Sequence, residues 1–310
     1  MAEFELIQDY FSGLSQPDSQ VVLGVGDDCA LLQPPAGKRL AMTMDTLIAG
    51  RHFLSDEHPS GIGYKSLAVN LSDLAAMGAQ PAWALLSISF PQIDHSWLEA
   101  FVSGFVTLMR EQGVQLVGGD TCQGALSITW QLTGFIEPGQ EMRRSAARPG
   151  DAIYVTGTLG DAALALEMKR AGQDPGELEQ RLTRPVPRVE EGRRLGAAGV
   201  RSCIDISDGL VADLGHICKQ SGCAARVHLN RLPVSPRVRQ YLQEGGDFRP
   251  VVAGGDDYEL CFTASPDSVA HLQDMPVTRI GEILPGEGVE LLDGSGNALP
   301  LPPAWEHFAS

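Results

Sequence analysis

The chain has 310 residues, of which 43% are hydrophobic and 20% are charged, and its formal net charge at pH 7 is −16. This length suffices for one large domain or two ordinary domains. The acidic balance argues against a general nucleic-acid binder, which would carry a basic surface, and the lack of a run of 18 apolar residues argues against a membrane span.

The first half of the chain is predicted to alternate strands with helices. A short amphipathic helix is predicted at 4–14, strands at 21–26, 39–47, 83–90 and 126–136, and long helices at 62–77 and 97–112. Gly78 and Gly113 directly follow the two long helices and are predicted to end them.

A turn at 149–151 looks like the start of a second domain. We therefore place a boundary near 138–150 and expect domains at 1–138 and 149–310. The second domain is predicted to contain a tight connection at 157–160, helices at 161–171, 188–199 and 208–221, strands at 153–156, 225–229 and 258–263, and a β-rich end. The segment LDGSGNAL at 292–299 favours a hairpin turn, because it lacks the full ligand spacing of a calcium loop.

The six cysteines form no CxxC pair, and their spacing is unlike that of a secreted disulfide scaffold. We interpret them as reduced thiols that are mostly buried. The first residues, MAEFELIQDYFSGL, lack the basic start and the apolar core of a signal peptide. These features favour a cytoplasmic location.

Aspartates recur in apolar or glycine-rich surroundings along the whole chain. A single motif of this kind is at least as often a turn, because Asp bonds its own backbone there. The segments are LGVGDDCALL at 23–32, MTMDTL at 42–47, NLSDLAAMG at 70–78, VGGDT at 117–121, DISDGL at 205–210 and GGDDYEL at 254–260.

Asp73 lies inside a predicted helix, on the same face as Ser66, Asn70 and Met77. The rest of this helix is apolar, so an unpaired carboxylate would be costly there. A metal ligand is therefore favoured over an ordinary solvent-facing stripe.

Two further patterns favour an oxygen-rich site. Thr43 and Asp45 share one side of a predicted strand. Glycines precede the acids at 118–121 and 254–257, where they permit close backbone approach to a ligand and free N–H groups for an anion. Oxygen ligands favour Mg²⁺ or Mn²⁺, so the pattern indicates phosphoryl transfer or metal-assisted hydrolysis of a polyphosphate.

The usual phosphate and nucleophile motifs are absent: there is no Walker A sequence, no kinase HRD or DFG set and no GxSxG elbow. TGTLGDAALAL at 156–166 fits an anion loop or a tight strand-to-helix connection equally well. Ser207 fits a helix cap or a phosphate donor, and Arg144 fits a phosphate contact or a solvated side chain. Trp305 fits a core anchor or a ring stacked on a ligand.

In sequence and spacing, the chain resembles the thiamine-monophosphate kinase family from about residue 4 to 308. The resemblance rests on GVGDDCALL, DTLIAGRHF, AVNLSDLAAMGAQP, GGDT, RSAARPGD, YVTGTLGD, DISDGL and GGDDYELCF. This family belongs to the superfamily of aminoimidazole ribonucleotide synthetase. The resemblance implies an α/β fold of two domains, a β-rich N-terminal domain that binds ATP and metal and forms the barrel of a homodimer, and an α/β C-terminal domain.

The resemblance also implies an activity, the ATP-dependent phosphorylation of thiamine monophosphate to thiamine diphosphate. The family usually has Glu where this chain has Asp256, and often Tyr where it has Trp305. Its functional positions map onto metal ligands at Asp28, Thr43, Met44 (by its carbonyl), Asp45, Asp73, Asp120, Asp205 and Asp208, onto ATP contacts at Gly119, Asp120, Arg144 and Ser207, and onto substrate contacts at His52, Asp256 and Trp305.

No general base is expected, because the second pKa of a phosphate monoester is about 6 and the acceptor is already an anion at neutral pH. We expect direct in-line transfer assisted by several Mg²⁺ ions, without nucleic-acid or membrane partners. The alternatives are a sister enzyme of the superfamily, a metal-dependent phosphohydrolase and a non-catalytic binding protein. Among the sister enzymes, selenophosphate synthetase would need a reactive Cys near its N-terminal glycines, which we do not find, and the hydrogenase maturation dehydratase would end in Cys, whereas this chain ends in HFAS.

Overall fold

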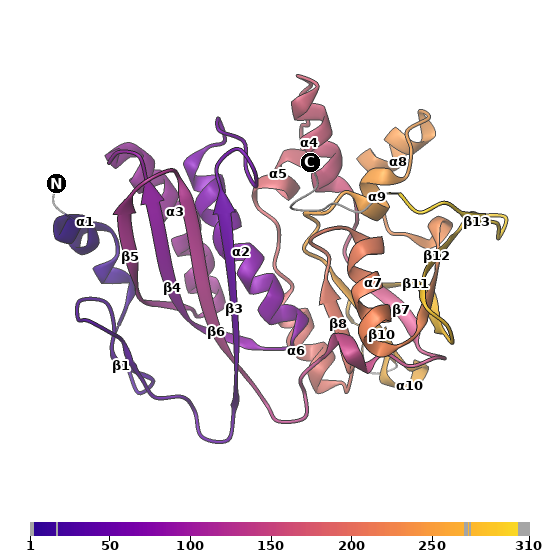
Figure 1. The fold of residues 1–310 in the computed structure, drawn as a ribbon, viewed down its shortest axis with the longest axis horizontal. Coiled ribbons are helices and arrows are strands. Elements are labelled where there is room, and N and C mark those ends of the chain that lie inside the picture. Colours follow the sequence, from indigo (N-terminus) through magenta and orange to yellow (C-terminus); the bar gives the residue numbers. More distant parts are fainter. Residues whose placement is uncertain (1–2, 17, 270–271, 273, 303–310) are drawn as a thin grey trace. The chain divides into compact units, whose positions relative to one another are not determined.

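The computed structural model describes residues 3–16, 18–269, 272 and 274–302. The chain forms two compact units, one made of residues 1–74 and 79–139 and the other of residues 75–78 and 140–310 (Figure 1). Each unit has a main sheet of its own, four-stranded in the first and seven-stranded in the second. No helix in the described part of the chain is long and apolar enough to cross a membrane.

The N-terminal unit is built on a four-stranded sheet in the order β3-β6-β4-β5, in which only β4 and β5 run parallel. The predicted helices and strands are all present, with β2 and β5 in addition. The elements are α1 (Glu3–Tyr10), η1 (Ser12–Leu14), β1 (Val21–Leu23), β2 (Leu31–Leu32), β3 (Arg39–Ile48), α2 (Pro59–Ala76), β4 (Gln80–Phe90), α3 (His95–Gln112), β5 (Gln115–Gln123) and β6 (Ser127–Ile136).

Both long helices end at the predicted glycines. Gly113 follows α3 in the left-handed region, with φ 67°, and its N–H donates to the carbonyl of Arg110. Gly78 has φ 74° and its N–H donates to the carbonyl of Ala75. A side chain is disfavoured at this φ, which is why glycine is the residue that stops a helix there.

Helices α2 and α3 cover one face of this sheet (Figure 1). Trp130 of β6 is fully buried beneath them. Its ring meets Phe105 of α3 edge-on at 5.0 Å between centroids, and its Nε1–H donates to Oγ of Ser66 on α2 at 2.9 Å. Because the indole N–H has a partner, the ring can be buried without the cost of an unsatisfied donor.

The opposite face of the sheet is apolar yet exposed. Alternate residues of β3 point to it, and Leu85 of β4 shares it because Gln131 of β6 pairs with both Met44 and Leu85. Monomeric proteins seldom leave such a surface open to water. We call this surface the exposed apolar face; it consists of Leu40, Met42, Met44, Ile48 and Leu85, which are between 40% and 67% exposed.

Residues 117–121 lie within strand β5, an element that the sequence did not predict. The strand pairs in parallel with β4, placing Gly119 opposite Leu86. A Cβ atom on Gly119 would lie 1.9 Å from the carbonyl oxygen of Leu86. Glycine is therefore needed at position 119 because strand β4 lies close to it, whereas the sequence pattern had suggested the close approach of a ligand.

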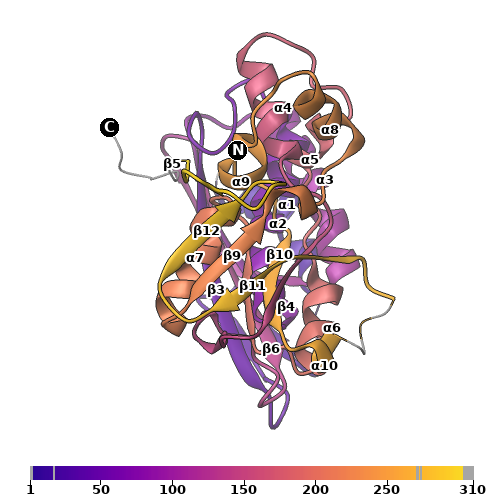
Figure 2. The same ribbon diagram turned by 90° about the vertical axis from the view of Figure 1, so that its right-hand side faces the viewer.

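The C-terminal unit is built on a mixed seven-stranded sheet in the order β13-β12-β9-β11-β7-β10-β8; Figure 2 shows β12, β9 and β11 side by side. Of its elements, α5, β8, α8, α9 and α10 were not predicted. The elements are η2 (Arg144–Ala146), β7 (Ala152–Thr156), α4 (Asp161–Arg170), α5 (Leu178–Thr183), α6 (Val189–Ala197), β8 (Ser202–Asp205), α7 (Leu210–Ser221), β9 (Ala224–His228), η3 (Leu229–Arg231), α8 (Pro236–Gln243), α9 (Arg249–Ala253), β10 (Leu260–Ala264), α10 (Pro266–Val269), β11 (Val277–Leu284), β12 (Gly288–Leu292) and β13 (Ala298–Leu299).

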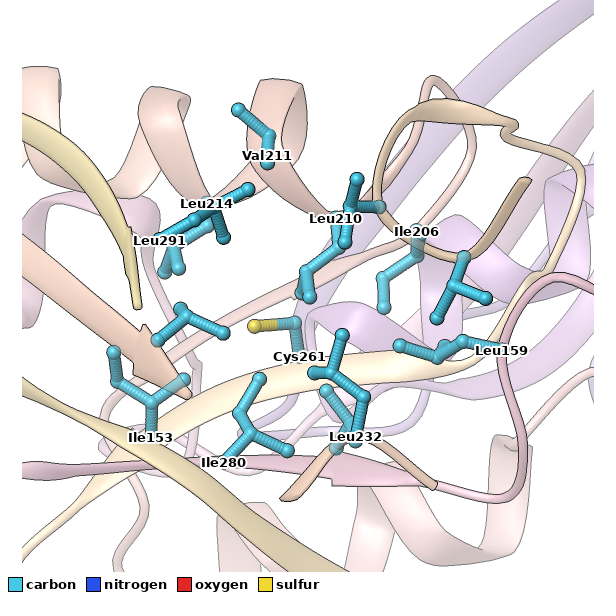
Figure 3. Close-up of a cluster of buried hydrophobic side chains, with 14 of the residues drawn as sticks. Ile153, Leu159, Ile206, Leu210, Val211, Leu214, Leu232, Cys261, Ile280 and Leu291 are labelled. Carbon is cyan, nitrogen blue, oxygen red and sulfur yellow. The ribbon is translucent and has the colours of Figure 1, made fainter. Parts of the chain in front are cut away.

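The core of this unit lies between α7 and the sheet. Figure 3 shows Leu210 and Leu214 of α7 on one side of Cys261 and Ile280 of β11 on the other. All four side chains are fully buried. The segment at 292–299 is a hairpin turn, as predicted, since Leu292 pairs with Ala298 across an antiparallel β12–β13 contact.

All six thiols are free, as predicted. Cys29 and Cys122 of the N-terminal unit are exposed, whereas the four thiols of the C-terminal unit are buried. Burial raises the pKa of Cys218 to about 12, with a smaller contribution from Cys223. The buried thiols, Cys203, Cys218, Cys223 and Cys261, therefore stay protonated in the folded protein.

Candidate functional site

In the N-terminal unit, β3 and α2 bring two of the predicted metal ligands together. The hydroxyl of Thr43 donates to Oδ2 of Asp73, which links the strand to the helix. The backbone N–H of Asp45 donates to Oδ1 of Asn70 at 3.0 Å. Burial, and then the negative charge of Asp73, raise the pKa of Asp45 from 3.8 to about 6.

These groups suit a hard divalent cation. Asp45, Asp73 and Thr43 present only oxygen atoms, which is the donor chemistry that Mg²⁺ prefers. The raised pKa of Asp45 reflects desolvation and repulsion between like charges, and a bound cation would relieve the repulsion. Among the described residues no three His, Cys, Asp or Glu side chains gather into a metal site, so the pair needs further oxygen ligands, as Mg²⁺ sites at phosphates usually do.

The acidic loop after β1 leaves Asp28 exposed. Oδ1 of its neighbour Asp27 accepts the backbone N–H of Asp28 at 2.9 Å. Asp27 thus stabilises the turn locally, although both carboxylates of the pair are exposed. The loop connects β1 to β2, which pair antiparallel.

Asp120 lies on the opposite side of the sheet from Asp45. Asp120 of β5 pairs with Ser87 of β4, which pairs with Thr129 of β6, and Thr129 pairs with Thr46 of β3. Directly paired residues share a face, and the hydroxyls of Thr46 and Thr129 meet at 2.8 Å. Asp120 therefore belongs to the side of the exposed apolar face, and a single N-terminal unit does not bring it to Asp45.

Two other predicted residues lie on or just after β3. The side chain of Met44 belongs to the exposed apolar face. His52 lies in the turn that follows β3, and its Nδ1 accepts the backbone N–H of Ile48 at 3.0 Å. A pocket of about 340 Å³ at the end of β5 begins at Thr121, directly after Asp120, and none of the predicted residues lines it.

In the C-terminal unit, three glycine-containing loops that are far apart in the sequence lie together. The N–H of Gly160 donates to Oδ1 of Asp257 at 2.8 Å. The N–H of Asp256 donates to the carbonyl of Ser207 at 2.9 Å. The loops at 157–160, 206–209 and 254–258 therefore form one edge of this unit.

Two N–H groups of the loop at 157–160 donate to other groups of the protein. Besides Gly160, Leu159 donates its N–H to the carbonyl of Pro233 at 2.9 Å. Asp161, in the first turn of α4, accepts the hydroxyl of Thr158 at 2.7 Å and that of Ser235. This pattern favours the tight connection over the anion loop, the other reading of this segment.

Glu259 is a buried anion that sequence reasoning missed. Its carboxylate, wholly inaccessible to solvent, meets Arg181 at 2.7 Å and Arg188 at 2.6 Å and accepts the hydroxyl of Thr156 at 2.6 Å. These partners lie 71 to 103 positions away in the sequence, so no local pattern could reveal them. The cluster fixes Gly157 as well, since a Cβ there would lie 2.1 Å from Oε1 of Glu259.

The loop between β8 and α7 presents three predicted residues. Asp205, the last residue of β8, is buried, Ser207 is exposed and Asp208 is half-buried. Ser207 does not cap α7, because the cap position is Gly209 and no side chain bonds there. Asp213 of α7, absent from the predicted set, accepts backbone N–H groups of this loop, and burial followed by the charge of Asp208 raises its pKa to about 7.

Asp256 has φ 60°, a conformation that costs energy for a residue with a side chain. Its Oδ1 accepts the hydroxyl of Tyr258 at 2.9 Å. Arg144 is exposed in η2, and its carbonyl accepts the hydroxyl of Ser221 at 2.8 Å. Trp305 lies outside the described residues.

The comparisons with known proteins agree on one family. The family model of the AIR synthase related protein, N-terminal domain, matches residues 26–136, and that of the C-terminal domain matches residues 148–293. The thiamine-monophosphate kinase of Salmonella typhimurium is 43% identical over 99% of this chain and 98% of its own length.

Two solved structures extend the likeness to three dimensions. The crystal structure of thiamine-monophosphate kinase from Stenotrophomonas maltophilia is 44% identical, with a TM-score of 0.87 over 96% of this chain and 98% of that one. The structure of AaThiL complexed with AMPPCP and TMP is 31% identical, with a TM-score of 0.81 over 99% of this chain and 97% of that one.

Proposed function

The chain belongs to the thiamine-monophosphate kinase family, and on this basis we propose that it transfers the terminal phosphate of ATP to thiamine monophosphate, yielding thiamine diphosphate and ADP. The observation that carries the proposal is the identity of 43% over 99% of this chain and 98% of a relative with that name. A match of this extent spans both units and every segment that contains an aspartate motif. The relative complexed with AMPPCP and TMP supports ATP and thiamine monophosphate as the two substrates.

The reaction needs positioning and charge neutralisation more than acid–base chemistry. The acceptor phosphate is already ionised at neutral pH, since its second pKa is about 6. Two anions must meet in line, and a chain with a formal charge of −16 cannot neutralise them by itself. We therefore propose several Mg²⁺ ions, which would supply the positive charge at the transferred phosphoryl group.

The chain's own residues would hold these ions and orient the substrates. Asp45, Asp73 and Thr43 form the part of the metal site for which the geometry gives the best support. Arg144 is exposed and can reach phosphate oxygens through its planar guanidinium. We propose further metal ligands at Asp28, the carbonyl of Met44, Asp120, Asp205 and Asp208, and further ATP contacts at Gly119, Asp120 and Ser207.

For thiamine monophosphate we propose contacts to His52, Asp256 and Trp305. The hydroxyl of Tyr258 donates to Oδ1 of Asp256 at 2.9 Å, which orients this carboxylate. Asp is one methylene shorter than the Glu that is usual in the family. We expect a water molecule to bridge that difference.

We also propose that the protein is a homodimer joined through the exposed apolar face. Enclosing Leu40, Met42 and Leu85 against a second copy would remove their apolar surface from water. Asp120, which lies on the same side of the sheet, would then be at the interface. We therefore propose that the N-terminal unit forms the dimer and carries part of the ATP and metal contacts.

A cytoplasmic location is part of the proposal. The co-substrate ATP is supplied there, and all six cysteines are free thiols, as expected in a reducing compartment.

The test is a product assay with thiamine monophosphate, ATP and Mg²⁺, with and without EDTA. We expect thiamine diphosphate and ADP in equal amounts, and none of either with EDTA. ATP consumption without thiamine diphosphate would favour a sister enzyme or a phosphohydrolase. ATP binding without any consumption would favour a binding protein.

A further inference from the structure

One carboxylate of α7 organises the loop that precedes this helix. Asp213 is 3% exposed, and its Oδ2 accepts the backbone N–H groups of Ser207 at 3.0 Å, Asp208 at 3.0 Å and Gly209 at 3.1 Å. Three consecutive N–H groups therefore converge on a single oxygen atom. All four residues lie in the described part of the chain.

This arrangement is the reverse of an ordinary N-cap. In a usual cap the residue before the helix accepts an N–H group of the first turn. Here the N-cap is Gly209, without a side chain, and Asp213 reaches back from inside the helix. The backbone N–H of Asp213 donates to the carbonyl of Gly209 at 3.0 Å, so both the backbone and the side chain of Asp213 are bonded to the loop.

Three converging N–H groups are the same chemistry that binds phosphate at many helix starts. In this protein the carboxylate of Asp213 fills that position. The loop can therefore keep its shape before ATP arrives, and its N–H groups are not available to a phosphate. The groups that remain for a ligand are the exposed hydroxyl of Ser207 and the half-buried carboxylate of Asp208.

The loop is also held from its other side. The N–H of Asp256 donates to the carbonyl of Ser207 at 2.9 Å, and the N–H of Tyr258 donates to the carbonyl of Ile206 at 2.8 Å. Leu210, directly after the loop, and Ile206, at its start, both point into the buried core in Figure 3. The backbone at 206–209 is thus fixed by hydrogen bonds on both sides and by the core beneath.

We propose that Asp213 is a positioning residue of the phosphoryl-transfer site: it holds the 206–209 loop in the shape that presents Ser207 to ATP and Asp208 to a metal ion. It acts through these two residues and itself contacts no substrate. This inference rests on the proposed function, because it assumes that Ser207 and Asp208 have the roles given above.

The test compares Asp213→Ala with Asp213→Asn in steady-state kinetics of the full-length protein. Alanine leaves the three N–H groups without their acceptor, and we expect kcat/KM for ATP to fall about 10- to 100-fold, the range found when a partner of a metal ligand is removed. Most of the loss should be in KM for ATP and in the Mg²⁺ concentration that gives half-maximal rate. Asparagine keeps an acceptor oxygen and should restore both values toward those of the unaltered protein.

Asp161→Ala is the matched control for loss of a buried carboxylate in a first helical turn. Asp161 of α4 is also 3% exposed and also accepts bonds from the loop before its helix. We expect this variant to lose stability but to keep KM for ATP and the Mg²⁺ requirement. A merely structural role of Asp213 would give the same result, so equal behaviour of the two alanine variants would overturn the inference.

Asp208→Asn separates the inference from the function on which it rests. An impaired Asp208→Asn variant beside an Asp213→Ala variant with normal KM for ATP would overturn the role of Asp213 alone. Full activity of Asp208→Asn would instead contradict the site assignment. If Asp213→Ala does not fold, Asp213→Leu takes its place, because it is close in size but has no acceptor oxygen: a raised KM for ATP supports the inference, and a normal one overturns it.

Discussion

The backbone N–H of Asp45 lies 3.0 Å from Oδ1 of Asn70, so a fully buried amide on α2 fixes the position of a carboxylate on β3. The other end of the same amide donates to the carbonyl of Ser66 at 3.2 Å, and Oγ of Ser66 accepts the indole N–H of Trp130. One chain of hydrogen bonds thus runs from the core to the metal site.

Replacing Asn70 with Ala should therefore lower both stability and activity. The backbone N–H of Asp45 would lose its acceptor in a partly buried position, at a cost of about 1–3 kcal/mol. We expect urea unfolding to report that loss and kcat to fall while the protein remains folded. Wild-type kcat in the Asn70→Ala variant would show that Asp45 needs no such support.

Asp73→Asn should nearly abolish turnover, because the amide keeps the shape of the side chain but removes the charge that would hold Mg²⁺. A loss of about 100-fold or more in kcat is expected at ordinary Mg²⁺ concentration, measured as formation of thiamine diphosphate. Asp9→Asn, an exposed carboxylate of α1, is the control and should have no effect. Near-normal turnover of Asp73→Asn would contradict the metal assignment.

The pH dependence of stability should reveal the cost of ionising Asp45 in the folded protein. Its pKa in the folded protein is raised from 3.8 to about 6, so the folded state binds the proton more tightly than the unfolded state does. Stability of the metal-free protein should therefore fall as pH rises through about 4 to 6. At pH 7.5 with EDTA, Asp45→Asn should be more stable than the unaltered protein by about 1–2 kcal/mol, after allowance for solvent screening. The difference should vanish near pH 4 in urea titrations.

Breaking the buried cluster at Glu259 should destabilise the C-terminal unit strongly. Glu259→Ala leaves Arg181 and Arg188 without their buried partner, at a cost of about 3–5 kcal/mol. The control is Glu190→Ala, which breaks an exposed pair with Arg193 at 3.2 Å and should cost less than about 1 kcal/mol. Equal midpoints for the two variants in urea would refute the importance of the cluster.

Met42→Glu should dissociate the proposed homodimer, because Met42 is 67% exposed at the exposed apolar face and a carboxylate there could not be buried. Light scattering coupled to size exclusion should show a monomer. Val22→Glu alters another exposed apolar residue, on β1, and should leave the dimer intact. A monomeric unaltered protein would remove the dimer from the proposal.

The sequence predicted those parts of the fold that depend on local patterns. Helix α3 is periodic, helix α2 is a long and largely apolar run, and both end at glycines in the left-handed region, so their positions follow from residue types alone. Strand β5 was not predicted, because Gly118, Gly119 and Asp120 are unfavourable in strands. These residues form a strand because they pair with the neighbouring strand β4. Strand β8 has only four residues, too few for a visible period.

In the candidate site, too, the sequence predicted the features that depend on local spacing and missed those that depend on tertiary contacts. The place of Asp73 on one helix face was visible in the spacing, and its meeting with β3 follows from packing that face on the sheet. The separation of Asp120 from Asp45 depends on strand order and register across four strands, which no local pattern contains. Asp213 was overlooked because its bonds run backward from a helix, against the usual direction of capping.

The distribution of exposed and buried thiols allows chemical labelling to report local unfolding of the C-terminal unit. A maleimide should modify Cys29 and Cys122 within the folded protein, because both are exposed. The thiols of the C-terminal unit are sealed in its core and should react only when that core opens. Intact-mass spectra after short labelling pulses would therefore show what fraction of the molecules carries more than two maleimide groups. That fraction measures how often the core of the C-terminal unit opens, because the two thiols of the N-terminal unit react in every molecule.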